Sequence, residues 1–409
     1  MSILCGNAVV GQSGGPTAAI NATLSGVIRG VLVAKDVIPT LYGMKNGVEG
    51  LLDERLVDLT RLFENEEDLL TLEDTPAAAL GSCRFKLPKP DADKKTFDRF
   101  LAIFKKYDIR YFFYIGGNDS MDAVAKLSAY LETVDYEMRV IGVPKTIDND
   151  LVGTDHTPGF GSAAKYIATT IKEIVRDCAV YTVSAVTIVE IMGRDAGWLT
   201  AASALASLSG DGPDLIYLPE RAFSLDGFFA DVRAALKKHP NVVVAVSEGL
   251  RFADGTYVGA STQSGATDSF GHAYLAGTGK FLERAVKAEI GCKVRAVELN
   301  LPQRCAAHLA SATDIEESVR TGMTAVSSAI NGISGHMMVA IRTDAPYKIE
   351  IASSPVSAIA NMVKTVPDAY ITESGNGITP AGIAYLAPLI LGERTPVYEN
   401  GMPKHIVIK

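Results

Sequence analysis

Residues 111–120 read Tyr-Phe-Phe-Tyr-Ile-Gly-Gly-Asn-Asp-Ser, and residues 140–150 read Val-Ile-Gly-Val-Pro-Lys-Thr-Ile-Asp-Asn-Asp. In each stretch, a short apolar run typical of a buried strand ends in a turn of glycine or polar residues. Ligands of open α/β sheets bind at the carboxyl ends of the strands. The two stretches therefore predict an α/β fold with a ligand site at these strand ends.

Apolar runs alternate with helical patterns along most of the chain. The predicted strands are 8–10, 111–115, 140–143, 186–191, 215–217 and 242–246. The predicted helices are 18–33, 94–107, 121–131, 162–176, 199–208, 225–237, 279–288 and 316–331. Such alternation with near-continuous apolar strands is typical of a parallel sheet covered by helices on both faces.

The composition narrows the class of protein. The 409 residues are enough for two domains, and 47% hydrophobic residues allow a large core. A net charge of −8 argues against a nucleic-acid or anionic-membrane partner. No apolar run approaches the roughly 18 residues of a transmembrane helix, and no signal peptide is evident. The five scattered cysteines suit reduced thiols, so we expect a cytoplasmic protein.

The stretch 144–150 has the residues that phosphoryl transfer to an alcohol requires. Asp148, close to Thr146 and Lys145, suits proton abstraction from a hydroxyl, while the Lys can neutralise phosphate charge. An Asx turn would explain the carboxylates but not the Lys. In the stretch 116–120, helix capping alone would explain Asp119 or Ser120 but not the glycine pair beside them.

Four further segments add polar groups at predicted turns. Residues 11–17 (Gly-Gln-Ser-Gly-Gly-Pro-Thr) would let backbone N–H groups approach a phosphate, although a plain tight turn explains them equally well. Arg194 lies in the turn 190–197, Glu248 follows the strand 242–246, and Gln303-Arg304 with Arg295 adds cations. One shared cleft is the simplest account of so many polar strand ends. Any single one could instead form a structural ion pair, and residues 277–280 (Gly-Thr-Gly-Lys) are interpreted as a helix start.

Taken in chain order, these motifs resemble those of the 6-phosphofructokinases. They are Ser13-Gly14-Gly15, residues 116–120, residues 144–150, Met192-Gly193-Arg194, Ser247-Glu248-Gly249 and Gln303-Arg304. The resemblance implies two Rossmann-like domains with mainly parallel sheets covered by helices, and an active site in the cleft between them. It implies a phosphate-donor domain of residues 1–161 plus about 303–355. The fructose 6-phosphate domain would comprise 162–302 plus about 356–409.

Two positions indicate the pyrophosphate-dependent branch of that family. ATP-dependent members have Gly where this chain has Asp119 and Lys145. A carboxylate at position 119 would repel the α-phosphate of ATP, and Lys145 would supply a cation to the transferring group. The resemblance thus implies a phosphotransferase of glycolysis and gluconeogenesis. It would move a phosphoryl group reversibly from pyrophosphate to the 1-hydroxyl of fructose 6-phosphate, with Mg²⁺.

The resemblance also implies roles for individual residues. Asp148 would be the base, and the catalytic group would comprise Asp148, Lys145, Asp119, Thr146 and Arg194. The donor site would comprise Gly14, Gly15, Arg84, Gly117 and Ser120. The sugar-phosphate site would comprise Thr146, Asp148, Met192, Gly193, Arg194, Glu248, Arg295, Gln303 and Arg304. Asn118 and Asp150 would face the metal, and Arg295 would reach a neighbouring subunit, which implies a homodimer or larger homo-oligomer.

The chain departs from the family pattern at several positions. Asn118 replaces the usual metal-facing Asp, and residues 299–304 lack the Gly-His/Tyr that usually precedes Gln-Arg. Ala185 replaces an Arg, and Asn21 and Ser25 replace effector-binding arginines of allosteric members. Two alternatives therefore stay open. One is an ATP-dependent 6-phosphofructokinase or a related sugar kinase, and the other is a catalytically silent regulatory subunit.

Overall fold

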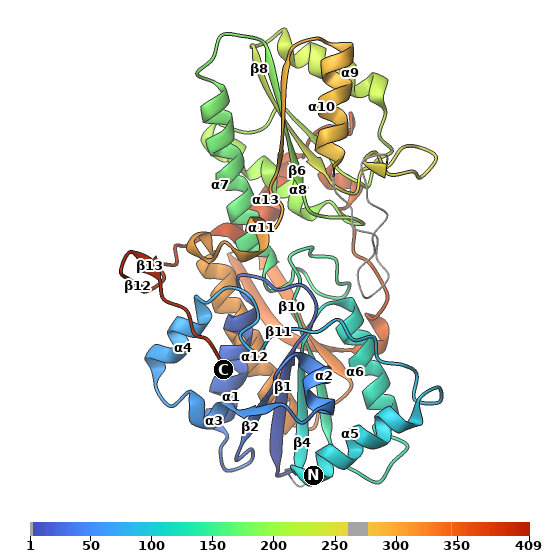
Figure 1. Cartoon of the computed structure of the whole chain (residues 1–409), viewed down its shortest axis with the longest axis vertical. Coiled ribbons are helices and arrows are strands. Elements are labelled where there is room, and N and C mark those ends of the chain that lie inside the picture. Colours follow the sequence, from blue (N-terminus) through green and yellow to red (C-terminus); the bar gives the residue numbers. More distant parts are fainter. Residues whose placement is uncertain (1–2, 261–276, 345) are drawn as a thin grey trace.

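The computed structural model describes residues 3–260, 277–344 and 346–409. Apart from one two-stranded ribbon near the C-terminus, their strands form two separate helix-covered sheets, stacked as two lobes along the long axis of the molecule (Figure 1). The predicted fold class, α/β with mainly parallel sheets and a site between two lobes, is confirmed.

The larger sheet has seven strands in the order β11-β10-β5-β4-β1-β2-β3. Their bounds are β1 Asn7–Gln12, β2 Leu41–Met44, β3 Leu56–Asp58, β4 Ile109–Gly116, β5 Arg139–Pro144, β10 His336–Asp344 and β11 Tyr347–Pro355. The five central strands are parallel, and the edge strands β3 and β11 pair antiparallel. The carboxyl ends of β1, β4 and β5 therefore lie side by side, as the opening stretches predicted.

Helices cover both faces of this sheet because its strands alternate between two cores. Phe112 and Tyr114 of β4 pack with α2 (Gly47–Leu52), α5 (Lys94–Lys106) and α6 (Asn118–Leu131). Tyr111 and Phe113 pack on the other face with α1, α3, α4 and α12. These helices are α1 Ile20–Val33, α3 Leu59–Leu62, α4 Glu66–Glu73 and α12 Ala312–Ile330.

Two glycines let α1 and α12 pack closely. A Cβ at Gly26 would lie 2.1 Å from the carbonyl oxygen of Val319, and a Cβ at Gly322 would lie 2.3 Å from that of Thr23. No larger residue fits at either position without a shift of the backbone. The contact places α12, from the last quarter of the chain, beside the first helix (Figure 1).

The smaller sheet is entirely parallel, in the order β7-β8-β6-β9. Its strands are β6 Ala185–Ile191, β7 Leu215–Tyr217, β8 Asn241–Ser247 and β9 Lys293–Glu298. One face packs on α7 (Phe160–Cys178) and α8 (Trp198–Ala202). The other face packs on α9 (Leu225–Leu236) and α10 (Thr278–Glu289). The carboxyl ends of β6, β8 and β9 point toward the larger lobe (Figure 1).

The remaining elements are short. They are α11 Pro302–Cys305, α13 Pro380–Leu386, β12 Tyr398–Glu399, β13 Met402–Pro403, and the 3-10 turns η1 Ser203–Ser209, η3 Ala307–Leu309, η4 Val356–Ala358, η5 Asp368–Tyr370 and η6 Ala387–Ile390. The last residues return to the larger lobe, where Ile406 and Ile408 pack against its core. The predicted domain boundaries stay a proposal.

Every predicted strand and helix has a counterpart, with ends moved by a few residues. The predicted helix 199–208 is α8 followed by the 3-10 turn η1. Sequence reasoning missed β2, β3 and β9–β13. Of these, β2 and β3 are only four and three residues long, and β9 and β11 alternate apolar with polar or charged residues. Among the described helices, none has the length and apolarity to cross a membrane. All five cysteines are free thiols.

Candidate active site

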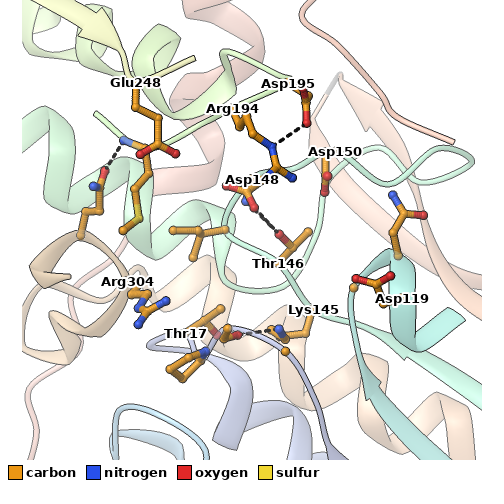
Figure 2. Close-up of a pocket in the computed structure, with 18 of the residues that line it drawn as sticks. Thr17, Asp119, Lys145, Thr146, Asp148, Asp150, Arg194, Asp195, Glu248 and Arg304 are labelled. Atoms are coloured by element: carbon orange, nitrogen blue, oxygen red, sulfur yellow. Dashed lines mark hydrogen bonds and ion pairs between the residues drawn. The ribbon is translucent and has the colours of Figure 1, made fainter. Parts of the chain in front are cut away.

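A cavity of about 780 Å³ lies where the strand ends of the two lobes face each other. The close-up in Figure 2 shows its polar side chains pointing inward from both lobes. From the larger lobe come the turns after β1, β4 and β5, and from the smaller lobe those after β6, β8 and β9. This is the shared cleft that the sequence predicted.

The glycine turn after β1 approaches two cations. Gly14 has φ of +76°, a left-handed conformation that favours glycine. A Cβ built on Gly14 would lie 3.4 Å from Lys145 Nζ, and one on Gly15 would lie 3.5 Å from Arg304 Nη1. Lys145 also donates a hydrogen bond of 2.6 Å to the carbonyl oxygen of Gly15. The backbone of this turn therefore lies close to two positively charged side chains.

Helix α6 begins directly at the cavity. Its N-cap is Gly117, which supplies no side-chain capping bond, and Asp119 lies in the first turn. Helix capping, the structural explanation considered from the sequence, therefore does not account for Asp119. The Asp119 side chain forms no hydrogen bond or ion pair with the described residues, and its carboxylate borders the cavity. A Cβ on Gly116 would lie 1.9 Å from Ser120 Oγ, so this turn also needs its glycine.

The turn after β5 contains two carboxylates, those of Asp148 and Asp150. Thr146 Oγ1 donates to Asp148 Oδ2 at 3.2 Å and accepts from the backbone N–H of Asp148 at 3.0 Å. Burial raises the pKa of Asp148, an effect that Thr146 and Lys145 oppose. Burial and the neighbouring Asp148 raise the pKa of Asp150 to about 7. A carboxylate whose pKa is raised toward neutrality is a better proton acceptor.

Lys145 is almost fully enclosed, with 3% of its surface exposed. Burial lowers its pKa to about 8, although Asp148 and Asp150 favour its charged form. At neutral pH the side chain is therefore a desolvated cation next to the two carboxylates. Such a charge acts on a bound anion far more strongly than an exposed lysine does.

The smaller lobe contributes polar side chains and a cation to the cavity. Glu248 Oε1 accepts from the backbone N–H of Gly193 at 3.2 Å, and burial raises the pKa of Glu248 to about 8. Gln303 Oε1 accepts from the backbone N–H of Met192 at 3.2 Å. Arg194 pairs with Asp195 at 3.0 Å. The Glu248 and Gln303 bonds fix the turn after β6, so the Arg194 side chain extends into the cavity (Figure 2).

Glu190, near the end of β6, caps the N-terminus of α10. Its carboxylate accepts from the backbone N–H groups of Gly277 and Gly279, at 3.1 and 2.8 Å, at the N-terminus of α10. Burial raises its pKa, and these N–H groups oppose the rise. The interpretation of residues 277–280 as a helix start is confirmed. Glu190 occupies the N–H groups that a phosphate would need there.

A divalent cation fits the part of the cavity around Asn118. Asn118 Oδ1 accepts no hydrogen bond from any described residue. This oxygen is therefore available to coordinate a cation. Asp119 and Asp150 line the same cavity. Within 3–260, 277–344 and 346–409, no three His, Cys, Asp or Glu side chains are grouped to hold a metal on their own. This is the pattern of a cation held by few side chains, water and a bound phosphate.

The cavity gathers nearly all the predicted site residues. Its lining includes Gly14, Gly15, Arg84, Gly117, Asn118, Asp119, Ser120, Lys145, Thr146, Asp148, Asp150, Met192, Arg194, Glu248, Gln303 and Arg304. Gly193 lies just behind it and orients Glu248. Arg295 does not line it. Arg295 is exposed on β9, the edge strand of the smaller sheet.

Sequence reasoning missed several lining residues. Thr17 is the last residue of the quoted glycine turn, and Asp195 lies in the quoted turn of Arg194, so closer attention to these motifs could have found both. Asn361 and Val363 also line the cavity. They follow no apolar strand and lie more than two hundred residues from the donor motifs, so no local signal identifies them.

The arrangement suits transfer of a phosphoryl group to a hydroxyl. Lys145, Arg84, Arg194 and Arg304 bring positive charge to the cavity, and Asp148 offers a proton acceptor among them. Preorganised cations stabilise charge that develops on phosphate oxygens. A carboxylate at hydrogen-bonding distance from an alcohol can remove its proton.

Residues 7–329 match the protein family described as Phosphofructokinase. The chain is 43% identical to a pyrophosphate–fructose 6-phosphate 1-phosphotransferase of Xanthomonas campestris, over 99% of this chain and 96% of that protein. It is 42% identical to the protein of the same name from Halomonas elongata, over 97% and 95%. Among solved structures, the pyrophosphate-dependent phosphofructokinase of Nitrosospira multiformis is 38% identical and superposes with a TM-score of 0.89, over 99% of this chain and 97% of that one.

Proposed function

Because the chain belongs to the phosphofructokinase family, we propose that it transfers a phosphoryl group from pyrophosphate to the 1-hydroxyl of fructose 6-phosphate. The products are fructose 1,6-bisphosphate and phosphate, and the reaction runs in either direction. Relatives with this activity in their names match the chain nearly from end to end. The chain is therefore a phosphotransferase of sugar phosphates.

The observation that carries the choice of donor is the pair Asp119 and Lys145, which border the same half of the cavity. The Asp119 carboxylate has no partner among the described residues, so its charge is available to repel a third phosphate group. Lys145 offers a buried cation to the group in transfer. Pyrophosphate, which has only two phosphate groups, can contact Lys145 without occupying the space next to Asp119.

Asp148 is the proposed base. It takes the proton of the sugar 1-hydroxyl as the oxygen bonds to the nearer phosphorus of pyrophosphate. The bridging P–O bond breaks, and its electron pair leaves with inorganic phosphate. The 3.2 Å hydrogen bond from Thr146 orients the carboxylate, and its raised pKa favours proton uptake.

The two substrates occupy opposite halves of the cavity in this proposal. Gly14, Gly15, Arg84, Gly117 and Ser120 bind pyrophosphate from the larger lobe. From the smaller lobe, Met192, Arg194, Glu248, Gln303 and Arg304 bind fructose 6-phosphate. Gly193 contributes through its bond to Glu248. The arginines neutralise the sugar phosphate, and Glu248 accepts hydrogen bonds from sugar hydroxyls.

Phosphofructokinases generally need a divalent metal, and we propose Mg²⁺ here. Asn118 and Asp150 would hold it together with pyrophosphate oxygens and water, with Asp119 nearby. When bound, the ion neutralises charge on the phosphate oxygens of the donor. We also propose that the enzyme acts in the cytoplasm as a homodimer or larger homo-oligomer.

A side-by-side assay tests the function and its rivals. The purified chain is given fructose 6-phosphate and Mg²⁺ with either pyrophosphate or ATP. We expect kcat/KM for pyrophosphate to exceed that for ATP by at least about a hundredfold, as expected when a charge that borders the cavity repels the wrong donor. Comparable values would favour the ATP-dependent alternative. Binding of fructose 6-phosphate without turnover of either donor would favour a silent regulatory subunit.

A further inference from the structure

Residues 361–366, which we term the strap, run along the cavity in a part of the chain that the family match does not reach. At its start, the carbonyl oxygen of Met362 accepts a 2.9 Å hydrogen bond from Asn118 Nδ2. That bond orients the amide so that its Oδ1 is the atom left without a described partner. Asn361 and Val363 line the cavity on either side of this contact.

Lys364, in the middle of the strap, fastens the loop that follows the proposed base. Its Nζ donates to Asn149 Oδ1 at 3.2 Å, to the carbonyl of Thr154 at 3.1 Å and to that of Asp155 at 2.6 Å. Its backbone N–H donates to the carbonyl of Asp150 at 2.7 Å. One residue thus holds both ends of the loop 149–155, which directly adjoins Asp148.

The far end of the strap is bound to the smaller lobe. Trp198 Nε1 donates to the carbonyl of Lys364 at 2.9 Å, and the Lys364 ammonium lies 5.2 Å from the centre of the Trp198 ring. Glu220 Oε1 accepts from the backbone N–H groups of Val366 and Gly197, at 2.9 and 2.8 Å. Gly197 and Trp198 start the helix that follows the Arg194 turn.

The strap therefore contacts three elements that must align for the reaction: the start of α6, the loop after Asp148 and the turn of Arg194. We propose that it is a positioning element of this active site and that Lys364 is its positioning residue. This inference rests on the proposed function. Lys364 has no direct contact with substrate in this role. It acts through Asp150, Asn149 and Asp155.

Removal of the Lys364 ammonium from water is unfavourable, and the hydrogen bonds to its acceptors offset that cost. Its three acceptors are the side-chain oxygen of Asn149 and the backbone carbonyl oxygens of Thr154 and Asp155. An enclosed cation that loses its acceptors is strongly unfavourable, so the loop and the strap hold each other. A displacement of about 1 Å in a reacting group can lower the rate on the order of a hundredfold.

Lys364→Met tests the proposal, because it removes the Nζ bonds and keeps a chain of similar length. Lys165→Met is the matched control. Lys165 is also enclosed, and its Nζ also donates to backbone carbonyls, those of Ala310 and Gly392, away from the cavity. We expect kcat with pyrophosphate to fall on the order of 10²-fold in Lys364→Met and less than about threefold in Lys165→Met. The affinity for fructose 6-phosphate, measured by calorimetry, should change little.

Trp198 gives a second readout because it is the only tryptophan of the chain. Release of the strap exposes the indole to water, so the emission of Lys364→Met should move to longer wavelength, and that of Lys165→Met should not. If Lys364→Met does not fold, Trp198→Phe is measured instead. It removes the Nε1 donor together with part of the buried indole and should still lower kcat severalfold. A near-native kcat in the variant that is measured, or an equal loss in Lys165→Met, would overturn the proposal. Inactivity of the wild-type chain would instead refute the proposed function.

Discussion

Lys145 Nζ lies 2.6 Å from the carbonyl oxygen of Gly15, to which it donates a hydrogen bond. This contact joins the turn after β5 to the turn after β1, 130 residues apart in sequence. It holds the ammonium next to the glycine turn of residues 14 and 15, where we propose that pyrophosphate binds. Because the side chain is enclosed, its charge is directed toward a bound donor and is little screened by water.

Removal of this cation should impair chemistry more than binding. We expect Lys145→Met to lower kcat with pyrophosphate on the order of 10²–10³-fold, since the charge matters most as charge redistributes in the transition state. The free lysine loses its proton as pH rises through about 8, so kcat/KM of the wild type should decline above that pH. Steady-state rates from pH 6 to 10 measure this. Lys145→Arg stays charged, and retention of the same alkaline decline in that variant would contradict the assignment.

Asp119→Gly tests exclusion of ATP. We expect KM for ATP to fall with little gain in turnover, because the variant removes repulsion without adding a catalytic group. Combination with Lys145→Gly should shift preference toward ATP by more than the two single changes together, since both residues face one pocket. Asp119 lies in the first turn of α6 without a capping bond, so its loss should cost only about 0.3–1 kcal/mol of stability. An unchanged ratio of donor KM values would refute the exclusion.

Asp148→Asn tests the base. We expect kcat to fall on the order of 10²–10⁴-fold, the usual contribution of positioned acid–base catalysis. Binding of fructose 6-phosphate should persist, because Arg194, Glu248 and Arg304 remain. Single-turnover rates and calorimetric affinity separate the two effects. A variant with near-native kcat would mean that the proton goes to another group, with Asp150 the nearest candidate.

His156 should make stability depend on pH. Burial alone would lower its pKa, but hydrogen bonds of 2.8 and 2.7 Å to Asp155 and Glu317 outweigh it and raise the pKa to about 9. The unfolded value is about 6.5. The folded state therefore binds more protons, and this stabilisation is complete below pH 6.5 and is lost as pH rises through 9. Denaturant unfolding of wild type and His156→Gln at pH 6 and pH 9 should differ by more at pH 6, and equal differences would contradict the ion pairing.

Arg295 should act between subunits. It is exposed on the edge strand β9 and does not line the cavity of its own chain, so a role in catalysis requires a second copy. We expect sedimentation at assay concentration to show at least a dimer, as is usual for soluble enzymes. Arg295→Ala should raise KM for fructose 6-phosphate severalfold and leave kcat nearly unchanged. A fully active monomer would refute the shared site.

Much of the fold and the site could be predicted from sequence, because the signals involved are local. A buried parallel strand needs a continuous apolar run, and the turn after it needs glycines or polar residues. Residues 111–120 and 140–150 therefore predicted β4, β5 and the groups at their ends. Gly14 likewise has a positive φ of +76°, and a Cβ on Gly116 would lie 1.9 Å from Ser120 Oγ. Such requirements act over a few residues and leave a readable pattern.

Tertiary structure alone decided which distant residues complete the cavity. The strap residues Asn361 and Val363 follow no apolar run, and only tertiary packing brings them to the cavity that Asn118 and Asp119 line. Packing likewise made Gly117 the N-cap of α6 and left the Asp119 side chain without a described partner. It also placed the Glu190 carboxylate where it accepts hydrogen bonds from the first residues of α10. Burial, and hence the pKa of Lys145 and Lys364, depends on everything that surrounds a side chain. These properties arise from contacts across hundreds of residues, which no local pattern encodes.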